Sequence, residues 1–354
     1  MNHGQKLTAI DLYSGSGAVT QGLRDAGFQV LAAVDFDHIA CKTYRANHPR
    51  VVLVETDITE LTAKNLAEIA SIPETIDLLV VCAPCQPFSS QNKKKENDPR
   101  ARLILESTRF IKAFSPAMVF FENVPGLANS PLVDELRGKL KNIGYQLSAP
   151  MIHNAADFGV PQRRARCLMV ASKKSNAISS FSQANDGAKR TRKTVRDAIG
   201  KLPELADGGA DPDDPLHFSA KHSVLAMERL KHIPADGGSR RSLPAHLTLK
   251  CHTDPHKFPD VYGRLKWDDV APTLTTGCTD ITKGRFAHPV ANRAITLREA
   301  ALLQTFPNGY KFVGNKTQIA RQIGNAVPVK MMKTLAKSLR LVLEQNEIEV
   351  GRTG

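Results

Sequence analysis

The sequence is poor in cysteine and has no long apolar run, and each shortage excludes a class of protein. Six cysteines in 354 residues are too few and too scattered for a disulfide framework in a chain of this length. Neither apolar run, Leu78 to Cys82 or Ala117 to Phe121, approaches the ~20 residues that span a bilayer. The polar start, Met1 to Leu7, lacks the apolar stretch of a secretory signal. We therefore expect a protein with reduced thiols and no membrane span that stays in the cytoplasm.

Positive charge is in excess and is grouped along the chain. The 48 basic and 35 acidic side chains give a formal net charge of +13. The basic groups are Lys93 to Lys95 with Arg100 and Arg102, Arg163 to Arg166, Lys189 to Arg196, and Arg240 with Arg241. Such grouping fits a polyanionic partner, although an inert solvated surface is the alternative when charge alone is considered.

Short apolar runs alternate with helical stretches between residues 7 and 170. The apolar runs are Thr8 to Leu12, Val30 to Val34, Val51 to Val54, Leu78 to Cys82, Met118 to Phe121 and Cys167 to Ala171. The helical stretches are Val19 to Ala26, His38 to Asn47, Leu61 to Ala70, Leu103 to Phe114 and Val133 to Ile143. This alternation predicts a doubly wound α/β lobe with a mostly parallel sheet.

The rest of the chain predicts a second lobe and a return to the first. Residues 172–193 are rich in Ser, Lys, Asn and Ala and are expected to form an exposed connection. Irregular Gly, Pro, His and Asp clusters follow, which indicate a smaller, loop-rich lobe. Two helices are expected at Thr296 to Gln304 and Val329 to Leu343, and the second could pack back on the first lobe. The expected domains are therefore 1–171, 172–287 and 288–354.

The first three predicted strands end in residues that suit a nucleoside cofactor. The segment Asp11 to Ala18 contains Gly15 and Gly17, but Thr20 stands where a dinucleotide-binding turn has its third glycine. Asp35 follows the second strand, where a carboxylate can accept hydrogen bonds from ribose hydroxyls, and Asp57 follows the third. This set favours S-adenosylmethionine over NAD, and a tight turn with two helix N-caps is the alternative.

The fourth predicted strand ends in Cys82-Ala-Pro-Cys85, for which three interpretations compete. They are a thioredoxin-like dithiol, half of a zinc site, and a lone nucleophile at Cys85 in an electropositive setting. No second Cys-x-x-Cys or compact His/Cys pair exists, so no metal site is expected.

An acid and two arginines follow on neighbouring strands. Glu122 ends the fifth strand, and Arg164 and Arg166 alternate near the next, where they are expected to point to the same face. A structural ion pair is the alternative to a functional site.

Together these segments resemble, in order, the motifs of the cytosine-5 DNA methyltransferase family over most of residues 7–175 and 290–335. The resemblance implies the S-adenosylmethionine-dependent methyltransferase fold. The implied catalytic residues are Cys85, Glu122, Arg164 and Arg166. The implied cofactor-binding residues are Tyr13, Gly15, Gly17, Asp35, Asp57, Pro84, Leu103 and Asn325. The chain departs from the family at Tyr13, usually Phe, and at Ala18, Cys82 and Ala83, commonly Gly, Gly and Pro.

The resemblance also implies a mechanism and a partner. The Cys85 thiolate would add to C6 of a cytosine flipped out of duplex DNA, while Glu122 hydrogen-bonds the base and Arg164 and Arg166 hold both. Residues 91–102 resemble the loop that closes over the target, and 172–287 would be the target recognition domain. Candidate DNA contacts are Gln86, Ser89, Lys93, Lys94, Lys95, Arg100, Arg240 and Arg241.

The expected protein is a monomer without an obligate protein partner, in a bacterial restriction-modification or related epigenetic role. A family member acting on tRNA and a noncatalytic DNA-binding protein are the alternatives. The target sequence is not predicted.

Overall fold

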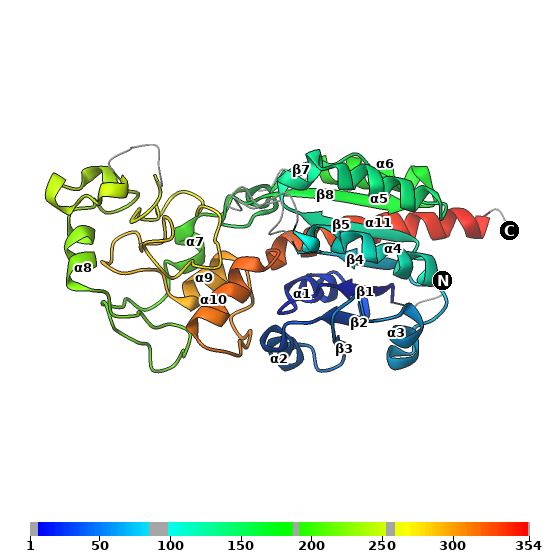
Figure 1. The fold of residues 1–354 in the computed structure, drawn as a ribbon, viewed down its shortest axis with the longest axis horizontal. Coiled ribbons are helices and arrows are strands. Elements are labelled where there is room, and N and C mark those ends of the chain that lie inside the picture. Colours follow the sequence, from blue (N-terminus) through cyan, green and yellow to red (C-terminus); the bar gives the residue numbers. More distant parts are fainter. Residues whose placement is uncertain (1–5, 85–97, 187–190, 253–258, 353–354) are drawn as a thin grey trace. The chain divides into compact units, whose positions relative to one another are not determined.

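The computed structural model describes residues 6–84, 98–186, 191–252 and 259–352 of the chain (Figure 1). The backbone falls into two compact units. The first unit comprises residues 1–158, 165–190 and 329–354, and the second comprises residues 159–164 and 191–328.

The first unit is built on one sheet whose strand order is β3-β2-β1-β4-β5-β8-β6, with β7 paired to β8. The strands are β1 (Thr8–Leu12), β2 (Gln29–Asp35), β3 (Val52–Glu55), β4 (Leu78–Val81), β5 (Met118–Asn123), β6 (Gln146–Leu147), β7 (Met151–Asn154) and β8 (Ala165–Ser172). Strands β1 to β5 run parallel, whereas β8 is antiparallel to β5, β6 and β7. The predicted mostly parallel sheet is confirmed, and the central strands β4 and β5 are buried throughout, as continuous apolar runs require.

Helices cover both faces of this sheet (Figure 1). They are α1 (Ala18–Asp25), α2 (His38–Asn47), α3 (Ala63–Ala70), α4 (Leu103–Phe114), α5 (Pro131–Lys141), α6 (Ser175–Asp186) and α11 (Val329–Arg352), with short 3-10 helices η2 (Pro99–Arg102), η3 (Pro125–Asn129) and η4 (Ala155–Phe158). Helix α4 packs between α3 and α5, and α11 packs against α1 and α6. A Cβ atom on Gly22 would lie 2.7 Å from the Met332 side chain, so this glycine permits the close approach of α1 and α11. The predicted return of the C-terminal helix to the first lobe is confirmed.

Helix α6 replaces the exposed connection that we expected over residues 172–193. Ala177 and Phe181, four residues apart, are buried, and the Phe181 ring packs edge-on against Phe120 of β5 at a centroid distance of 6.2 Å. The prediction was wrong because a few apolar side chains at helical spacing outweigh the surrounding polar residues, whose helix propensity is low.

The compact units do not coincide with the three expected sequence ranges. Residues 172–190 belong to the first unit because α6 packs on β8 and α11. Residues 288–328 belong to the second unit, and only 329–354 return to the first.

The second unit is rich in loops, as expected, and its helices are short. They are α7 (Val195–Ile199), α8 (Val224–Lys231), α9 (Leu297–Leu303) and α10 (Lys316–Asn325), with 3-10 helices η5 (Arg240–Ser242), η6 (Ala245–Leu247) and η7 (Lys250–His252). Its described strand pairing consists of isolated bridges, so other donors must satisfy buried carbonyl groups. The buried Arg264 guanidinium does so, since it donates to the carbonyl oxygens of Leu230 (2.8 Å), Ile233 (3.0 Å) and Ala291 (2.8 Å).

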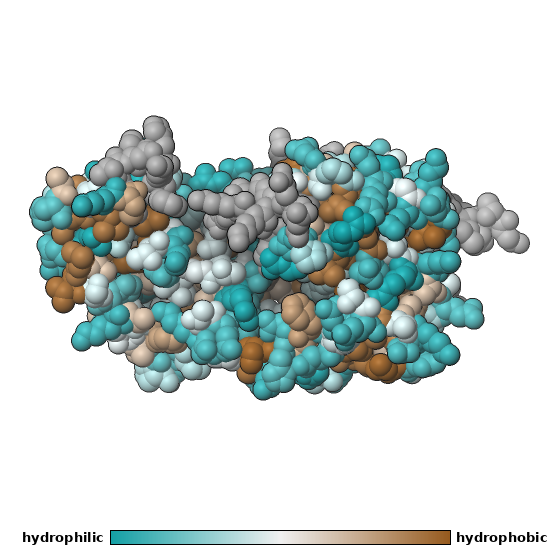
Figure 2. Space-filling view, viewed as in Figure 1, coloured by the Kyte–Doolittle hydropathy of each residue, from teal (hydrophilic) through white to brown (hydrophobic). Residues whose placement is uncertain are grey.

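Hydrophilic and apolar side chains are interspersed on the viewed surface of the molecule (Figure 2). Within the described part of the chain, no helix is both long enough and apolar enough to cross a membrane.

Candidate active site

Five parallel strands bring most of the predicted site residues of the first unit to one edge of the sheet. Tyr13, Gly15 and Gly17 follow β1, Asp35 ends β2, Asp57 follows β3, Pro84 follows β4, and Glu122 lies near the end of β5. Because the carboxyl ends of parallel strands meet at the same edge, residues more than 100 positions apart become neighbours there. This edge is where open α/β sheets bind ligands.

The turn after β1 is held by main-chain contacts and leaves space in front of it. Ser14 N–H donates to the Val34 carbonyl at 3.0 Å, and Gly15 N–H donates to the Asp35 carboxylate at 2.8 Å. Gly15 and Gly17 have φ angles of 54° and 93°, in the region that favours glycine. A Cβ atom on Gly15 would meet no heavy atom within 4 Å, so a ligand could approach this backbone closely.

A buried carboxyl group, Asp11, and a half-buried one, Asp35, favour a cationic ligand behind the turn. Burial raises the pKa of Asp11 from 3.8 to about 7, a hydrogen bond from Thr20 Oγ1 (2.7 Å) opposes the rise, and the Asp35 charge adds to it. Burial also raises the pKa of Asp35, although Gly15 and Asp37 donate their N–H groups to it. Asp11 Oδ1 is buried without a hydrogen-bond partner among the described atoms. A bound positive charge would stabilise both carboxylates.

The end of β3 carries an acid that accepts local hydrogen bonds, and the end of β2 is followed by an exposed aromatic ring. The exposed Asp57 accepts hydrogen bonds from Thr59 N (2.9 Å) and Thr59 Oγ1 (2.7 Å), which form a local turn and not the helix N-cap that we considered as the alternative, since Thr62 caps α3. Phe36, directly after Asp35, is 67% exposed and was missed in the sequence interpretation. An exposed aromatic residue directly after a strand-end acid is the signal that could have identified it, since its ring can stack on a purine.

Glu122 and Arg166 form a buried ion pair on adjacent strands. Arg166 Nε lies 2.8 Å from Glu122 Oε1, and each residue is only 7% exposed. The two groups form an ion pair at this distance, and Glu122 Oε1 has no hydrogen-bond partner among the described atoms. Arg166 therefore stabilises the charge of the acid and leaves that oxygen able to accept a hydrogen bond from a ligand.

Arg164 does not share the position of Arg166, because β8 begins after it. Its Nη1 and Nη2 atoms donate 2.9 Å hydrogen bonds to the carbonyl oxygens of Leu274 and Gly324, and all three residues belong to the second unit. The expectation that Arg164 helps to hold Glu122 is thus not supported. Its contacts brace the chain next to Asn325 instead.

Asn325 is the exposed last residue of α10, and a hydrogen-bonded chain of amides holds the end of this helix. Gln162 Nε2 donates to Gln304 Oε1 at 2.9 Å, and Gln304 Nε2 donates to the Ile323 carbonyl at 2.6 Å. The second unit thus brings together Gln162, Gln304 and Ile323, which are far apart in the sequence. Their contacts fix the backbone that presents Asn325.

Several predicted residues lie outside the described residues. They are Cys85, Gln86, Ser89, Lys93, Lys94 and Lys95. The chain just before Cys85 is anchored, because Cys82 N–H donates to the Leu12 carbonyl at 3.3 Å and Asn123 Nδ2 donates to the Ala83 carbonyl at 3.1 Å. Burial, together with the nearby charge of Glu122, raises the pKa of the Cys82 thiol well above its usual value, which favours the inert neutral form.

The remaining candidates for DNA contacts differ in exposure. Arg100 is exposed and forms an ion pair with Asp98 at 2.6 Å. Arg241 is exposed, whereas Arg240 is only 6% exposed. Arg240 is therefore not placed to reach a phosphate or a base edge, and its adjacency to Arg241 in the sequence was misleading.

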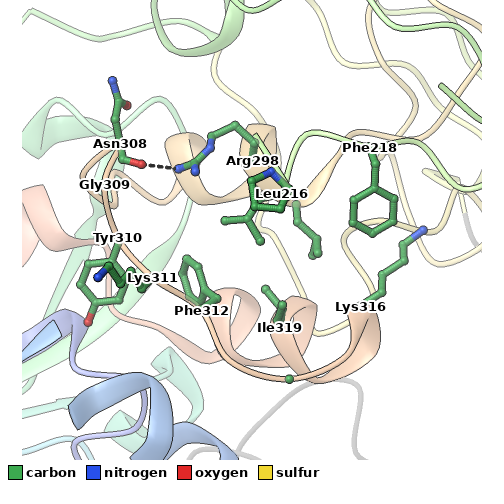
Figure 3. A pocket seen from close by; sticks show the side chains of 13 residues that line it. Leu216, Phe218, Arg298, Asn308, Gly309, Tyr310, Lys311, Phe312, Lys316 and Ile319 are labelled. Carbon is green, nitrogen blue, oxygen red and sulfur yellow. Dashed lines mark hydrogen bonds between the residues drawn. The ribbon is translucent and has the colours of Figure 1, made fainter. Parts of the chain in front are cut away.

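A cavity of about 520 Å³ lies within the second unit (Figure 3). Leu216, Phe312 and Ile319 contribute apolar wall, and Lys316 lies at its edge beside an aromatic ring. Arg298 donates to the Asn308 carbonyl at 2.8 Å and is also paired with an aspartate, so its charge is already neutralised. None of the site residues predicted from the sequence lines this cavity.

Comparison with known proteins agrees with this geometry. Residues 7–340 match the family described as C-5 cytosine-specific DNA methylase. The chain is 37% identical to the Type II methylase M.HgiDII of Herpetosiphon aurantiacus, covering 95% of each protein. It is 31% identical to the Type II methyltransferase M1.HphI of Haemophilus parahaemolyticus, covering 96% of this chain and 88% of that protein.

Solved structures share the fold. A prophage-encoded E. coli protein described as a DNA modification methyltransferase superposes with a TM-score of 0.74 at 26% identity, covering 96% of this chain and 99% of that one. The S. pombe Dnmt2 methyltransferase gives a TM-score of 0.66 at 20% identity, covering 97% of this chain and 100% of that one.

Proposed function

Because the chain belongs to the C-5 cytosine-specific DNA methylase family, we propose that it transfers a methyl group from S-adenosylmethionine to cytosine C5 in a specific duplex DNA sequence through a Cys85 adduct. The observation that carries the proposal is the buried Glu122–Arg166 pair, whose Glu122 Oε1 can accept a hydrogen bond. It lies at the sheet edge that also carries the open turn at Gly15. A role in bacterial restriction-modification follows from the Type II relatives.

The strand ends fit S-adenosylmethionine. The cofactor would supply an electrophilic methyl group on a sulfonium. The raised pKa values of Asp11 and Asp35 favour a cation near the turn, and Asp35 could also accept from ribose hydroxyls. The exposed Phe36 ring offers a stacking surface. The other residues proposed to contact the cofactor are Tyr13, Gly15, Gly17, Asp57, Pro84 and Leu103. Asn325 is proposed to complete the site from the C-terminal motif.

The protein groups divide the chemistry between them. The Cys85 thiolate forms a bond to C6 of cytosine, and the electron pair displaced from the C5–C6 bond makes C5 nucleophilic. Glu122 accepts a hydrogen bond from the amino group and, in its protonated form, donates its proton to N3, so the negative charge that develops on the ring is neutralised, while Arg166 keeps the acid oriented. After C5 has gained the methyl group, solvent accepts the C5 proton, the electron pair of that bond re-forms the C5–C6 double bond, and Cys85 leaves C6 as a thiolate.

Duplex DNA must give up its stacked target for this attack. The thiolate approaches the face of the ring, so the cytosine has to be flipped out of the helix. Lys93, Lys94, Lys95, Arg100 and Arg241 are proposed to bind phosphates, which position the protein without specifying sequence. The second unit is proposed to read the target bases.

The decisive experiment uses duplex DNA whose target cytosine carries fluorine at C5. Wild-type protein should form an adduct that survives denaturing electrophoresis, because fluorine cannot leave as a cation. Cys85→Ser should abolish the adduct, since a serine hydroxyl is much less ionised than a thiol. Cys82→Ser is the matched control and should still trap, whereas a dithiol mechanism needs both sulfurs.

Bisulfite sequencing of DNA from cells expressing the chain would identify the target for this test. Absence of an adduct on duplexes containing the methylated site would refute the covalent mechanism. Trapping on tRNA but on no duplex would favour an RNA substrate.

A further inference from the structure

The hydroxyl of Tyr13 joins the turn after β1 to the first residue of α4. Tyr13 Oη donates to the Leu103 carbonyl at 2.5 Å, across 90 positions of sequence. Burial raises the pKa of Tyr13, and the nearby Glu106 carboxylate raises it further, so the hydroxyl remains a protonated donor near neutral pH. The phenylalanine that is usual at this position in the resembling family has no hydroxyl to make this bond.

The Tyr13 backbone is strained, so a contact that holds its side chain stabilises the turn. Its φ angle is 63°, in the left-handed region that aromatic residues rarely adopt and that persists where the surroundings hold it. Main-chain bonds hold the residues on either side, since the Leu12 carbonyl accepts from Cys82 N–H and Ser14 N–H donates to the Val34 carbonyl. The side-chain bond to Leu103 adds a third attachment, to a helix rather than to a strand.

A side chain of α4 holds the turn after β3. Arg109 Nη1 and Nη2 donate to the carbonyl oxygens of Leu61 and Ile58, which follow Asp57 closely. Arg109 Nε also donates to Glu106 Oε2 at 2.9 Å, so an acid on the same helix orients the guanidinium. Helix α4 thus contacts the turn after β1 through its Leu103 carbonyl and the turn after β3 through its Arg109 side chain.

We propose that Tyr13, through its hydroxyl, and Arg109 are positioning residues that hold two cofactor-binding turns in register with α4. The inference rests on the proposed function, in which Tyr13, Asp57 and Leu103 form part of the S-adenosylmethionine site. A binding site that is already ordered in the free protein avoids the entropy cost of ordering its residues on binding. The two contacts therefore raise cofactor affinity. They play no part in the methyl transfer itself.

The test is calorimetric binding of S-adenosylmethionine and S-adenosylhomocysteine to the full chain. Tyr13→Phe keeps the ring and removes only the hydroxyl, and it should weaken both affinities roughly three- to tenfold, the range for one lost hydrogen bond.

Tyr145→Phe is the matched control for loss of a buried tyrosine hydroxyl. Tyr145 Oη donates to the Pro116 carbonyl at 2.7 Å, just before the amino end of β5 and therefore at the opposite edge of the sheet. This variant should lose thermal stability to a similar extent as Tyr13→Phe, yet keep both affinities within about twofold.

Arg109→Lys keeps the charge but cannot reach both carbonyl groups, so it should also weaken binding. The double variant with Tyr13→Phe should lose less affinity than the sum of the single losses, because both changes release the same helix. Arg109→Lys alone also carries the test if Tyr13→Phe fails to fold.

The outcomes distinguish failure of the proposed function from failure of the positioning role. Failure of the wild-type protein to bind either ligand would refute the proposed function. Unchanged affinity in both Tyr13→Phe and Arg109→Lys, with normal wild-type binding, would overturn the positioning role alone. Equal losses of cofactor affinity in Tyr13→Phe and Tyr145→Phe would also overturn the positioning role, because they would indicate general destabilisation.

Discussion

Asp11 should make the first unit less stable as the pH rises from about 4 to about 7. The carboxyl group is fully buried, and burial raises its pKa from 3.8 to about 7. Between these values the folded state holds a proton that the unfolded chain has released, so the free energy of unfolding falls with increasing pH. A shift of about 3 pKa units at about 1.4 kcal/mol per unit gives an upper limit of about 4 kcal/mol for this loss.

The perturbation that tests this is Asp11→Asn, which resembles the protonated acid and does not titrate. Its carbonyl oxygen can still accept the hydrogen bond from Thr20 Oγ1. The free energy of unfolding of the variant, relative to wild type, should therefore rise by up to about 4 kcal/mol between pH 4 and pH 8. Thr20→Val is the control, because it removes the donor and keeps the carboxyl group, so stability should still fall with increasing pH and the fall should extend to higher pH.

The assay must report on the unit that contains Asp11. The single tryptophan, Trp267, belongs to the second unit, so its fluorescence follows the other part of the chain. Urea unfolding followed by far-ultraviolet circular dichroism, without cofactor, detects the helices that cover the sheet. A stability difference between Asp11→Asn and wild type that stays constant from pH 4 to pH 8 would refute the reasoning.

Two further predictions concern the chemistry and the second unit. Glu122→Gln should lower single-turnover methylation on the order of 100-fold or more while S-adenosylhomocysteine affinity stays near wild type; a variant within a few-fold in rate would show that the acid is structural. Gly324→Ala would place a Cβ atom 2.4 Å from the Thr275 backbone, so it should destabilise the second unit by about 1–3 kcal/mol or more. Urea unfolding monitored by Trp267 fluorescence measures this loss, and an unchanged midpoint would contradict it.

The elements of the first unit could be predicted where apolar pattern decides the structure. The expected apolar runs coincide with β1, β2, β3, β4, β5 and β8 to within a few residues, because strands of a sheet that helices cover on both faces are largely apolar. The pattern could not reveal β6, which has two residues, or β7, whose residues are not buried. Helix α6 was also missed, because burial of a few apolar side chains outweighed its polar composition.

The second unit could be predicted only as irregular. Its interior depends on Arg264, whose guanidinium donates to carbonyl groups from separate segments such as Leu230 and Ala291. Nothing in the local sequence distinguishes this arginine from exposed ones, since the acceptors are brought together only by folding. The same difficulty explains Arg240, which is buried although Arg241 beside it is exposed.

The family-like motifs combine two kinds of residue that sequence order cannot separate. Glu122 and Arg166 are buried as a pair, and Glu122 Oε1 can still accept a hydrogen bond, as a site that receives a ligand requires. Gln162 and Arg164 lie just before Arg166 in the sequence, yet Gln162 binds the amide of Gln304 and Arg164 binds carbonyl groups of the second unit. Alternation along a strand cannot distinguish these roles, because the strand begins only after Arg164. Substitution of Arg164 should therefore lower the stability of the second unit, whereas substitution of Arg166 should act on the rate through Glu122.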